Sequence, residues 1–130
     1  MKIEHIAIWA KDIDKVCEFY QKYFGGVIQP LYHNPAKQFT SRFITFDDGA
    51  RLEVMHRPDI DVGTEELFHE EHCGLTHLSF SVGSKEEVDR LTQQMSGDKI
   101  TIVGQPRTTG DGYYESVVLD PEGNRVEVTI

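Results

Sequence analysis

The chain has 130 residues, of which 38% are hydrophobic and 27% are charged, a composition that is ordinary for a soluble globular protein. No apolar stretch reaches the roughly 18 residues that a membrane-spanning helix requires, and the N-terminus lacks the apolar run of a signal peptide, so we expect no membrane partner. The formal net charge of −9 repels phosphate backbones, which argues against a nucleic-acid partner.

The first half of the chain predicts a strand, a helix and three further strands. Residues 3–9 alternate and are rich in β-forming residues, which is typical of a strand. Asp12 marks the N-cap region of a helix whose apolar residues recur at helical spacing, and Gly25 and Gly26 end it. Three strand-like runs follow, around 27–32, 39–46 and 51–55.

The second half predicts the same order of elements. Residues 74–82 read as a strand, and Ser84 with Glu87 forms a capping box at the start of a helix that ends at Gly97. Strand-like runs follow near 100–103, 113–119 and 125–130. We expect the glycine-containing segment 104–112 to be a loop.

The two halves match in register, which indicates an internal repeat. His5 and His77 are 72 positions apart, and Glu53 and Glu127 are 74 apart. The prediction is therefore an α+β chain of two βαβββ units, residues 1–57 and 74–130, joined by an acidic connector at 58–73. Together they form a single domain, residues 1–130.

Chemically active side chains are expected on one face of the first and last strands of each unit. Side chains alternate between the two faces of a strand. The apolar face is expected to pack against the unit's helix, and the opposite face is mostly polar. That opposite face is predicted to hold His5, Ala7 and Trp9; Arg51, Glu53 and Met55; His77, Ser79 and Ser81; and Arg125, Glu127 and Thr129. Each unit thus presents one imidazole and one carboxylate, and the large apolar Trp9 and Met55 beside them suggest a cleft.

Two histidines and two glutamates suit a divalent metal ion. The predicted ligands are His5, Glu53, His77 and Glu127, one ion per site, and the donor set favours Zn²⁺, Ni²⁺, Co²⁺, Fe²⁺ or Mn²⁺. An octahedral ion with four protein ligands keeps two positions for substrate oxygens, where it acts as a Lewis acid. Any one of these residues alone is usually a surface residue, so the prediction depends on the two matched pairs.

Several motifs together carry a family resemblance. They are residues 5–8 (HIAI), 19–20 (FY) with 24–25 (FG), 51–54 (RLEV), 74–80 (GLTHLSF) and 120–127 (DPEGNRVE). The pattern resembles the vicinal oxygen chelate (glyoxalase/bleomycin resistance/dioxygenase) superfamily over nearly the whole chain. The resemblance implies two βαβββ repeats that form a curved mixed sheet with a metal-binding cleft.

Within that superfamily, the ligand order His, Glu, His, Glu looks closest to bacterial glyoxalase I (lactoylglutathione lyase)-like proteins. Three-ligand relatives, such as the extradiol dioxygenases, do not use the position of Glu53. The resemblance implies isomerisation of a 2-oxoaldehyde–thiol hemithioacetal through an enediolate, with Zn, Ni or Co as the metal, or else Fe or Mn. It makes Glu127 the catalytic base and Glu53 a ligand that can serve the other face of the substrate.

The residues around the substrate leave its identity open. Bacterial glyoxalase I typically has a basic residue where Trp9 stands; Trp9 could stack on a ring, cover an apolar substrate, or simply pack. Arg42, Arg57 and Arg107 are candidate groups for binding a glutathione or another thiol adduct. A homodimer is expected because open curved sheets have edges to cover.

Two other functions remain as alternatives. One is a metal enzyme of the same fold that acts on another substrate, such as an epimerase. The other is a protein of the resistance type that binds a drug or metabolite without chemistry, although sequestration needs no open metal site.

The cysteines are not predicted to be catalytic. Only Cys17 and Cys73 are available for a disulfide, and a reduced, cytoplasmic protein is the simpler interpretation. Cys17 falls near the apolar stripe of the first predicted helix and is interpreted as a small core residue rather than a nucleophile.

Overall fold

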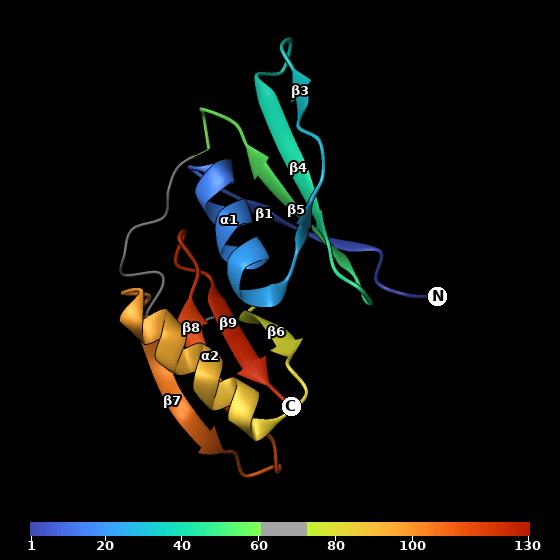
Figure 1. Cartoon of the computed structure of the whole chain (residues 1–130). Helices are drawn as coiled ribbons and strands as arrows, with labels where there is room; N and C mark the ends of the chain where they lie inside the picture. The colour runs from blue at the N-terminus through green and yellow to red at the C-terminus, as the bar shows by residue number, and fades with distance from the viewer. Residues whose placement is uncertain (61–72) are drawn as a thin grey trace. The chain divides into compact units, whose positions relative to one another are not determined.

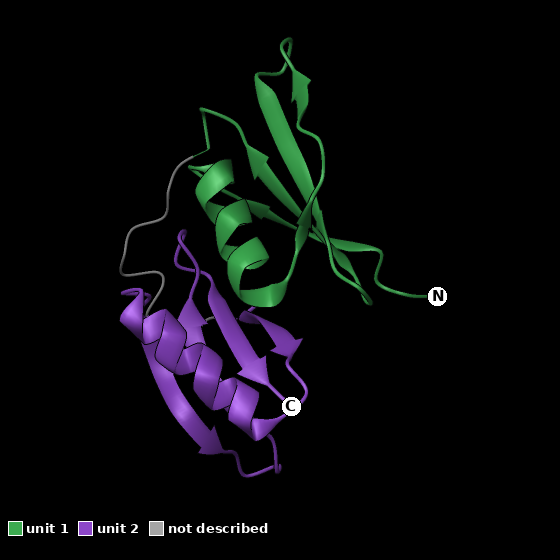
Figure 2. Ribbon diagram, in the orientation of Figure 1, with its two compact units in different colours: residues 1–63 green, residues 64–130 purple. Residues whose placement is uncertain are grey.

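The structure, a computed structural model, describes residues 1–60 and 73–130. The chain divides into two compact units, with the boundary between Gly63 and Thr64 (Figures 1 and 2). The boundary falls inside the predicted connector, most of which, residues 61–72, lies outside the described residues. None of the described helices is long and apolar enough to cross a membrane.

Unit 1 is a mixed sheet with one helix on one face (Figure 1). Its elements are β1 (His5–Trp9), α1 (Ile13–Phe24), β2 (Val27–Ile28), β3 (Tyr32–Asn34), β4 (Phe39–Thr45) and β5 (Arg51–His56). The strand order is β1-β5-β4-β2, and β3 also pairs with β4. β1 runs parallel to β5, and the other pairs are antiparallel.

Unit 2 repeats this topology. Its elements are β6 (His77–Ser81), α2 (Lys85–Gly97), β7 (Ile102–Thr108), β8 (Tyr114–Leu119) and β9 (Arg125–Thr129). The order β6-β9-β8-β7, with β6 parallel to β9, corresponds to β1-β5-β4-β2 in unit 1. The predicted α+β fold with two βαβββ repeats is therefore confirmed.

One predicted strand and one predicted loop differ from the observed elements. The run expected at 27–32 is two short strands, because pairing continues only to Gln29, whose N–H donates to the Phe43 carbonyl at 2.8 Å, and Pro30 then has no N–H to donate. The prediction of a loop at 104–112 is wrong for its first part, since β7 continues to Thr108. β7 is an edge strand with register shifts on either side of Gly104, a place where a sheet tolerates proline and irregular pairing.

The helix ends follow the predicted capping residues. The Asp12 carboxylate accepts a hydrogen bond at 3.1 Å from the backbone N–H of the third residue after it, and Gly25 ends α1 with φ +68°, a conformation that glycine adopts without strain. The Ser84 hydroxyl caps α2 by accepting from the N–H of Glu87 at 3.2 Å. Only this half of the capping box forms as expected, because the Glu87 carboxylate binds Arg90 instead.

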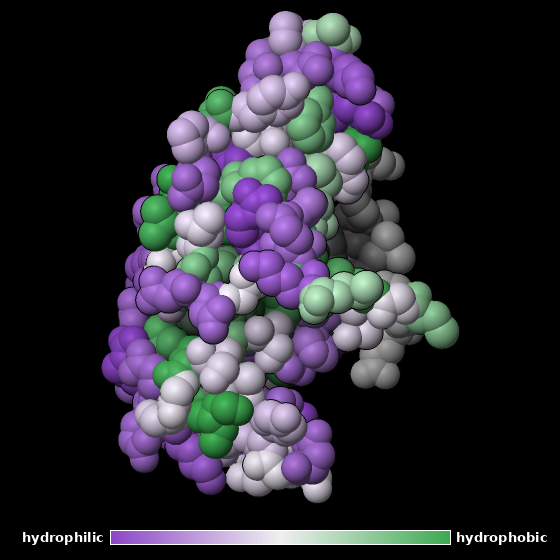
Figure 3. Space-filling view, turned by 90° about the vertical axis from the view of Figure 1, so that its right-hand side faces the viewer, coloured by the Kyte–Doolittle hydropathy of each residue, from purple (hydrophilic) through white to green (hydrophobic). Residues whose placement is uncertain are grey.

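The core of each unit lies between its helix and one face of its sheet. In unit 1 the buried apolar residues are Ile13, Val16, Cys17, Phe19, Tyr20 and Tyr23 of α1, with Ala10 before it and Ile44, Leu52 and Val54 of the sheet. In unit 2 they are Val88, Leu91 and Met95 of α2 with Val118, Val126 and Val128. Full burial of each such side chain contributes about 1.5–3 kcal/mol. On the face in view in Figure 3, hydrophilic residues predominate and hydrophobic ones form scattered patches.

Gly26 is predicted to be required for packing in unit 1. A methyl group there would lie 2.5 Å from Cγ2 of the fully buried Ile44, closer than van der Waals contact. Gly26→Ala should therefore lower the free energy of unfolding by about 1–3 kcal/mol, measured by urea denaturation. The control is Gly97→Ala, at an open helical position, where stability should stay the same or rise by up to about 1 kcal/mol. Equal losses in both variants would contradict this assignment.

The two thiols should differ sharply in reactivity. Cys17 is 1% exposed, and burial raises the pKa of its thiol to about 11, so almost no thiolate forms at pH 8. Cys73 is exposed. An aromatic disulfide reagent at pH 8 should titrate one thiol promptly in the folded protein and the second only in denaturant. Cys73→Ser should abolish the fast phase; a fast phase that persists would contradict the burial of Cys17.

Candidate metal centre

The first histidine–glutamate pair lies on unit 1, on the sheet face that α1 does not cover. The parallel register places Ala7 opposite Glu53, so His5 reaches Glu53 diagonally from two residues earlier on the same face. The Nε2 atom of His5 lies 3.9 Å from Oε2 of Glu53. The His5 side chain is 42% exposed and that of Glu53 only 17%, so the carboxylate lies deeper than the ring.

The second pair repeats this geometry on unit 2. Ser79 lies opposite Glu127, and His77 reaches Glu127 with a distance of 3.3 Å between Nε2 and Oε2. The exposed fractions are 40% for His77 and 18% for Glu127, nearly those of the first pair. The two units therefore offer the same donors in the same register at the same depth.

Both imidazoles use Nδ1 for another interaction and direct Nε2 at the glutamate. Nδ1 of His5 binds the carboxylate of Glu4, which also binds Arg51. The hydrogen bond with His5, and then the Arg51 guanidinium, lower the pKa of Glu4. Nδ1 of His77 lies 3.1 Å from Oγ1 of Thr76. A metal-binding histidine usually has its second ring nitrogen occupied in this way, which fixes the ring and leaves the other nitrogen for the ion.

Each pair by itself supplies two ligands. Within residues 1–60 and 73–130, no three His, Cys, Asp or Glu side chains form a cluster that could hold a metal ion. The meeting of His5, Glu53, His77 and Glu127 at one ion, and the catalytic roles of the two glutamates, stay predictions.

The surroundings of the two pairs differ. Next to Glu53 on the unit 1 face lies Phe43; the His5 ring stands edge-on to Phe43 at 5.5 Å between centroids, and the Arg51 guanidinium lies over it at 4.1 Å. The neighbours on the corresponding face of unit 2 are small or polar, namely Ser79, Ser81, Val117, Thr129 and the Glu115 that pairs with Thr129. Unit 1 thus provides aromatic surfaces and unit 2 provides hydroxyl groups.

Trp9 and Arg57, two of the predicted substrate-binding residues, lie together. Trp9 pairs with Met55 in the sheet, shares the face of Glu53, and is 40% exposed. The Arg57 guanidinium lies 5.6 Å from the centre of the Trp9 ring and is hydrogen-bonded to the Asp59 carboxylate.

The other two predicted arginines do not lie beside Trp9. Arg42 pairs with Val54 in the sheet and so points to the face that α1 covers, opposite Glu53; its guanidinium is 3.5 Å from the Asp14 carboxylate. Arg107 belongs to unit 2, where it pairs with Glu115 and Glu115 pairs with Thr129, so it lies on the same sheet face as Glu127; its guanidinium is 3.7 Å from Glu115. The structure therefore does not bring Arg42 together with the His5–Glu53 pair.

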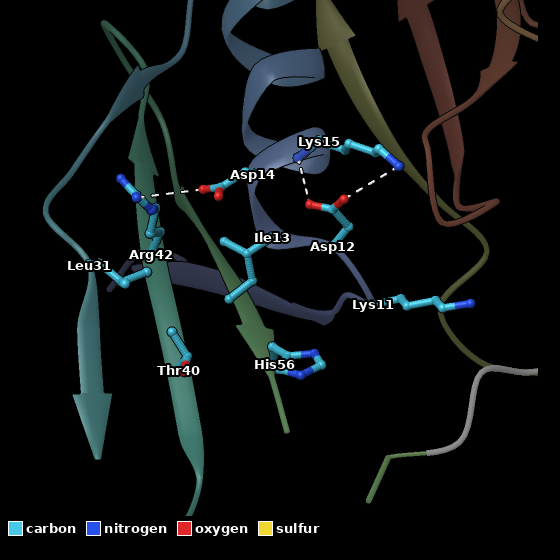
Figure 4. A pocket seen from close by; sticks show the side chains of 9 residues that line it. All are labelled: Lys11, Asp12, Ile13, Asp14, Lys15, Leu31, Thr40, Arg42 and His56. Carbon is cyan, nitrogen blue, oxygen red and sulfur yellow. Dashed lines mark hydrogen bonds and ion pairs between the residues drawn. The ribbon is translucent and has the colours of Figure 1, made fainter. Parts of the chain in front are cut away.

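Arg42 lines a pocket of about 510 Å³ at the N-terminal end of α1 (Figure 4). His56 also lines it and donates from Nδ1 to the Ala10 carbonyl at 2.9 Å. The remaining lining residues are Lys11, Asp12, Ile13, Asp14, Lys15, Leu31 and Thr40. Because the pocket is on the helix-covered side of the sheet, it is separate from the candidate metal ligands.

Sequence reasoning missed Glu4 and Phe39. Glu4 occupies the repeat position of Thr76, 72 residues earlier, so the repeat itself marked it as the neighbour of a candidate ligand. Phe39 lies edge-on to Trp9 at 6.2 Å between ring centroids, a contact between β4 and β1 that no local pattern marks.

The family comparison covers almost the whole chain. A family model described as "Glyoxalase/Bleomycin resistance protein/Dioxygenase superfamily" matches residues 2–128. The chain is also 23% identical over 129 residues to "Uncharacterized protein YqjT" of Bacillus subtilis (strain 168), which covers 97% of this chain and 96% of that protein.

Solved structures are similar in fold. A glyoxalase family protein from Enterococcus faecalis has a TM-score of 0.77 and 23% identity, with 99% of this chain and 97% of that chain covered. The trypanothione-dependent glyoxalase I of Leishmania major has a TM-score of 0.76 and 18% identity, with coverage of 99% and 86%. Glyoxalase I from Zea mays has a TM-score of 0.77 and 18% identity. The match covers 98% of this chain but only 44% of the maize chain. The chain belongs to the glyoxalase/bleomycin resistance protein/dioxygenase superfamily.

Proposed function

We propose that the protein is a divalent-metal-dependent enzyme of the glyoxalase type, which isomerises a hemithioacetal to a thioester. The observation that carries this proposal is the repeated pair: each unit directs a histidine Nε2 at a partly buried glutamate, at 3.9 Å in unit 1 and 3.3 Å in unit 2. A protein that only sequestered a ligand would have no use for four matched donors. The solved relatives that are named glyoxalase I share this fold and support the proposal.

The donor set fits a divalent ion. Two imidazole nitrogens and two carboxylates suit Zn²⁺, Ni²⁺ or Co²⁺, with Fe²⁺ or Mn²⁺ as further candidates. His5 and His77 would bind through Nε2, since Nδ1 is already occupied in each ring. When bound, such an ion supplies a Lewis acid for two adjacent substrate oxygens.

The chain's own residues would then move the proton. Glu127 is the proposed base: its carboxylate takes a proton from one substrate carbon and returns it to the neighbouring carbon, so no co-reactant is consumed. Its partial burial limits competition from water, and its cross-strand neighbour Ser79 has a small side chain. Glu53, which lies beside Phe43, would hold the ion and face the other side of the substrate.

Substitution of the glutamates tests the metal centre. By calorimetry with Zn²⁺ or Ni²⁺, we expect one ion per site, and Glu53→Gln and Glu127→Gln should each weaken binding by more than about 100-fold. Stability should change by no more than about 1 kcal/mol, because a partly exposed ion pair contributes little. Glu127→Gln should also lower the rate of thioester formation from methylglyoxal and a thiol by about 10²–10⁴-fold.

The control for both variants is Glu18→Gln on the exposed face of α1, which should change neither binding nor rate. Unchanged metal affinity in both site variants would overturn the metal centre. Metal binding without thioester formation would leave a metal enzyme of the same fold acting on another substrate.

Glu4 is predicted to strengthen metal binding through His5. Its carboxylate binds Nδ1 of His5, and loss of such a partner typically weakens metal affinity by about 10–100-fold. Glu4→Gln should therefore weaken binding in the same calorimetric titration while unfolding at the same urea concentration. Asp59→Asn, which removes another exposed carboxylate of unit 1, should leave the affinity unchanged. If the two variants bind metal equally well, Glu4 has no such role.

A further inference from the structure

The face of unit 1 that holds His5 and Glu53 becomes aromatic toward one end. Three rings gather there, from β1, β4 and β3: Trp9 lies edge-on to Phe39, and Tyr32 lies against the other side of Phe39, each at 6.2 Å between centroids. The register places all three on the side of Glu53, because Tyr32 pairs with Ser41 and Ser41 with Met55. We call Trp9, Phe39 and Tyr32 the aromatic wall.

The wall is close to the candidate metal ligands and is exposed. Met55, which pairs with Trp9, is two residues from Glu53 along β5, a distance of roughly 7 Å. Trp9 is 40% exposed and Tyr32 55% exposed. Grouped apolar surface next to candidate functional residues commonly marks a binding site.

The arginines on this part of the chain already have carboxylate partners. Each of the three arginines within residues 1–60 is paired with a carboxylate: Arg42 with Asp14, Arg51 with Glu4, and Arg57 with Asp59. Recognition of a substrate carboxylate depends on cationic donors, arginine above all. Beside the wall, Arg57 lies against the Trp9 ring and is held by Asp59.

We propose that the part of the substrate that does not react is a neutral aromatic or apolar group that lies against the aromatic wall. This inference rests on the proposed function and specifies its substrate class. A hemithioacetal whose ring or apolar chain adjoins the two vicinal oxygens would place that group toward Trp9, whose partner Met55 is two residues from Glu53. A glutathione-type arm with two carboxylates finds neutralised arginines here.

Binding of matched hydroxamates to the zinc-loaded protein tests the proposal. The probes share a head with two vicinal oxygens and differ in the arm: acetohydroxamate, benzohydroxamate, 2-naphthohydroxamate and 4-carboxybenzohydroxamate. Trp9 is the single tryptophan of the chain, so its emission reports on the wall directly. We expect affinity to rise at least about tenfold from the methyl to the naphthyl arm, with a change in Trp9 emission, and to fall when the arm carries a carboxylate.

Variants test whether the preference for the naphthyl arm depends on the aromatic wall or on exposed apolar residues in general. By calorimetry, Trp9→Ala should lose most of the preference for the naphthyl arm, whereas Trp9→Phe should keep it. Tyr113→Ala removes another exposed aromatic residue, in unit 2, and should have no effect. Equal affinity for the methyl and naphthyl arms, tighter binding of the carboxylate arm, or an unchanged preference in Trp9→Ala would overturn the inference.

Failure of the proposed function gives a different result. A prior titration with zinc alone that shows no binding overturns the metal centre and leaves the wall to be tested by itself. In that case 2-naphthol should change the emission of Trp9 at lower concentration than 2-naphthoate does. The absence of any response, or a preference for 2-naphthoate, would overturn the wall as well.

Discussion

The candidate site depends on the parallel pairing of two strands in each unit, β1 with β5 and β6 with β9. A parallel pair needs a long connection, and here the connection contains the helix and the antiparallel strands that complete the sheet. The pairing brings a histidine near the start of each unit to the same face as a glutamate near its end. The register then sets which side chains lie diagonally opposite, and both units have the same register.

One face of each sheet forms the core, and the other carries the candidate site residues. One face packs on the helix and forms the core, in which Val54 and Val126 are fully buried. The residues beside them in sequence, Glu53 and Arg125, necessarily point to the other face. A unit can therefore change the chemistry of its outer face without repacking its core, which is what the aromatic neighbours of Glu53 and the hydroxyl neighbours of Glu127 illustrate.

The setting of the arginines bears on specificity. Arg51 neutralises Glu4 and covers Phe43, so it supports the surroundings of His5 rather than presenting a free charge. Arg42 lies on the opposite face of the sheet, where it pairs with Asp14. Recognition of an anionic ligand on the face of Glu53 would require arginines without carboxylate partners, so the pairing of Arg51 and Arg57 bears on which substrate class is selected.

The sequence alone determined the two helices, the repeat and the faces of the first and last strands of each unit. These follow from local periodicity, from capping residues such as Asp12 and Ser84, and from an offset of 72 to 74 residues between the halves. It also indicated one histidine–glutamate pair per unit. Only the tertiary structure decided the length of β7, the partner of Arg42 and the gathering of aromatic rings around Trp9. These features depend on which strands become neighbours and which become edges, and such contacts between distant residues leave no periodic trace in the sequence.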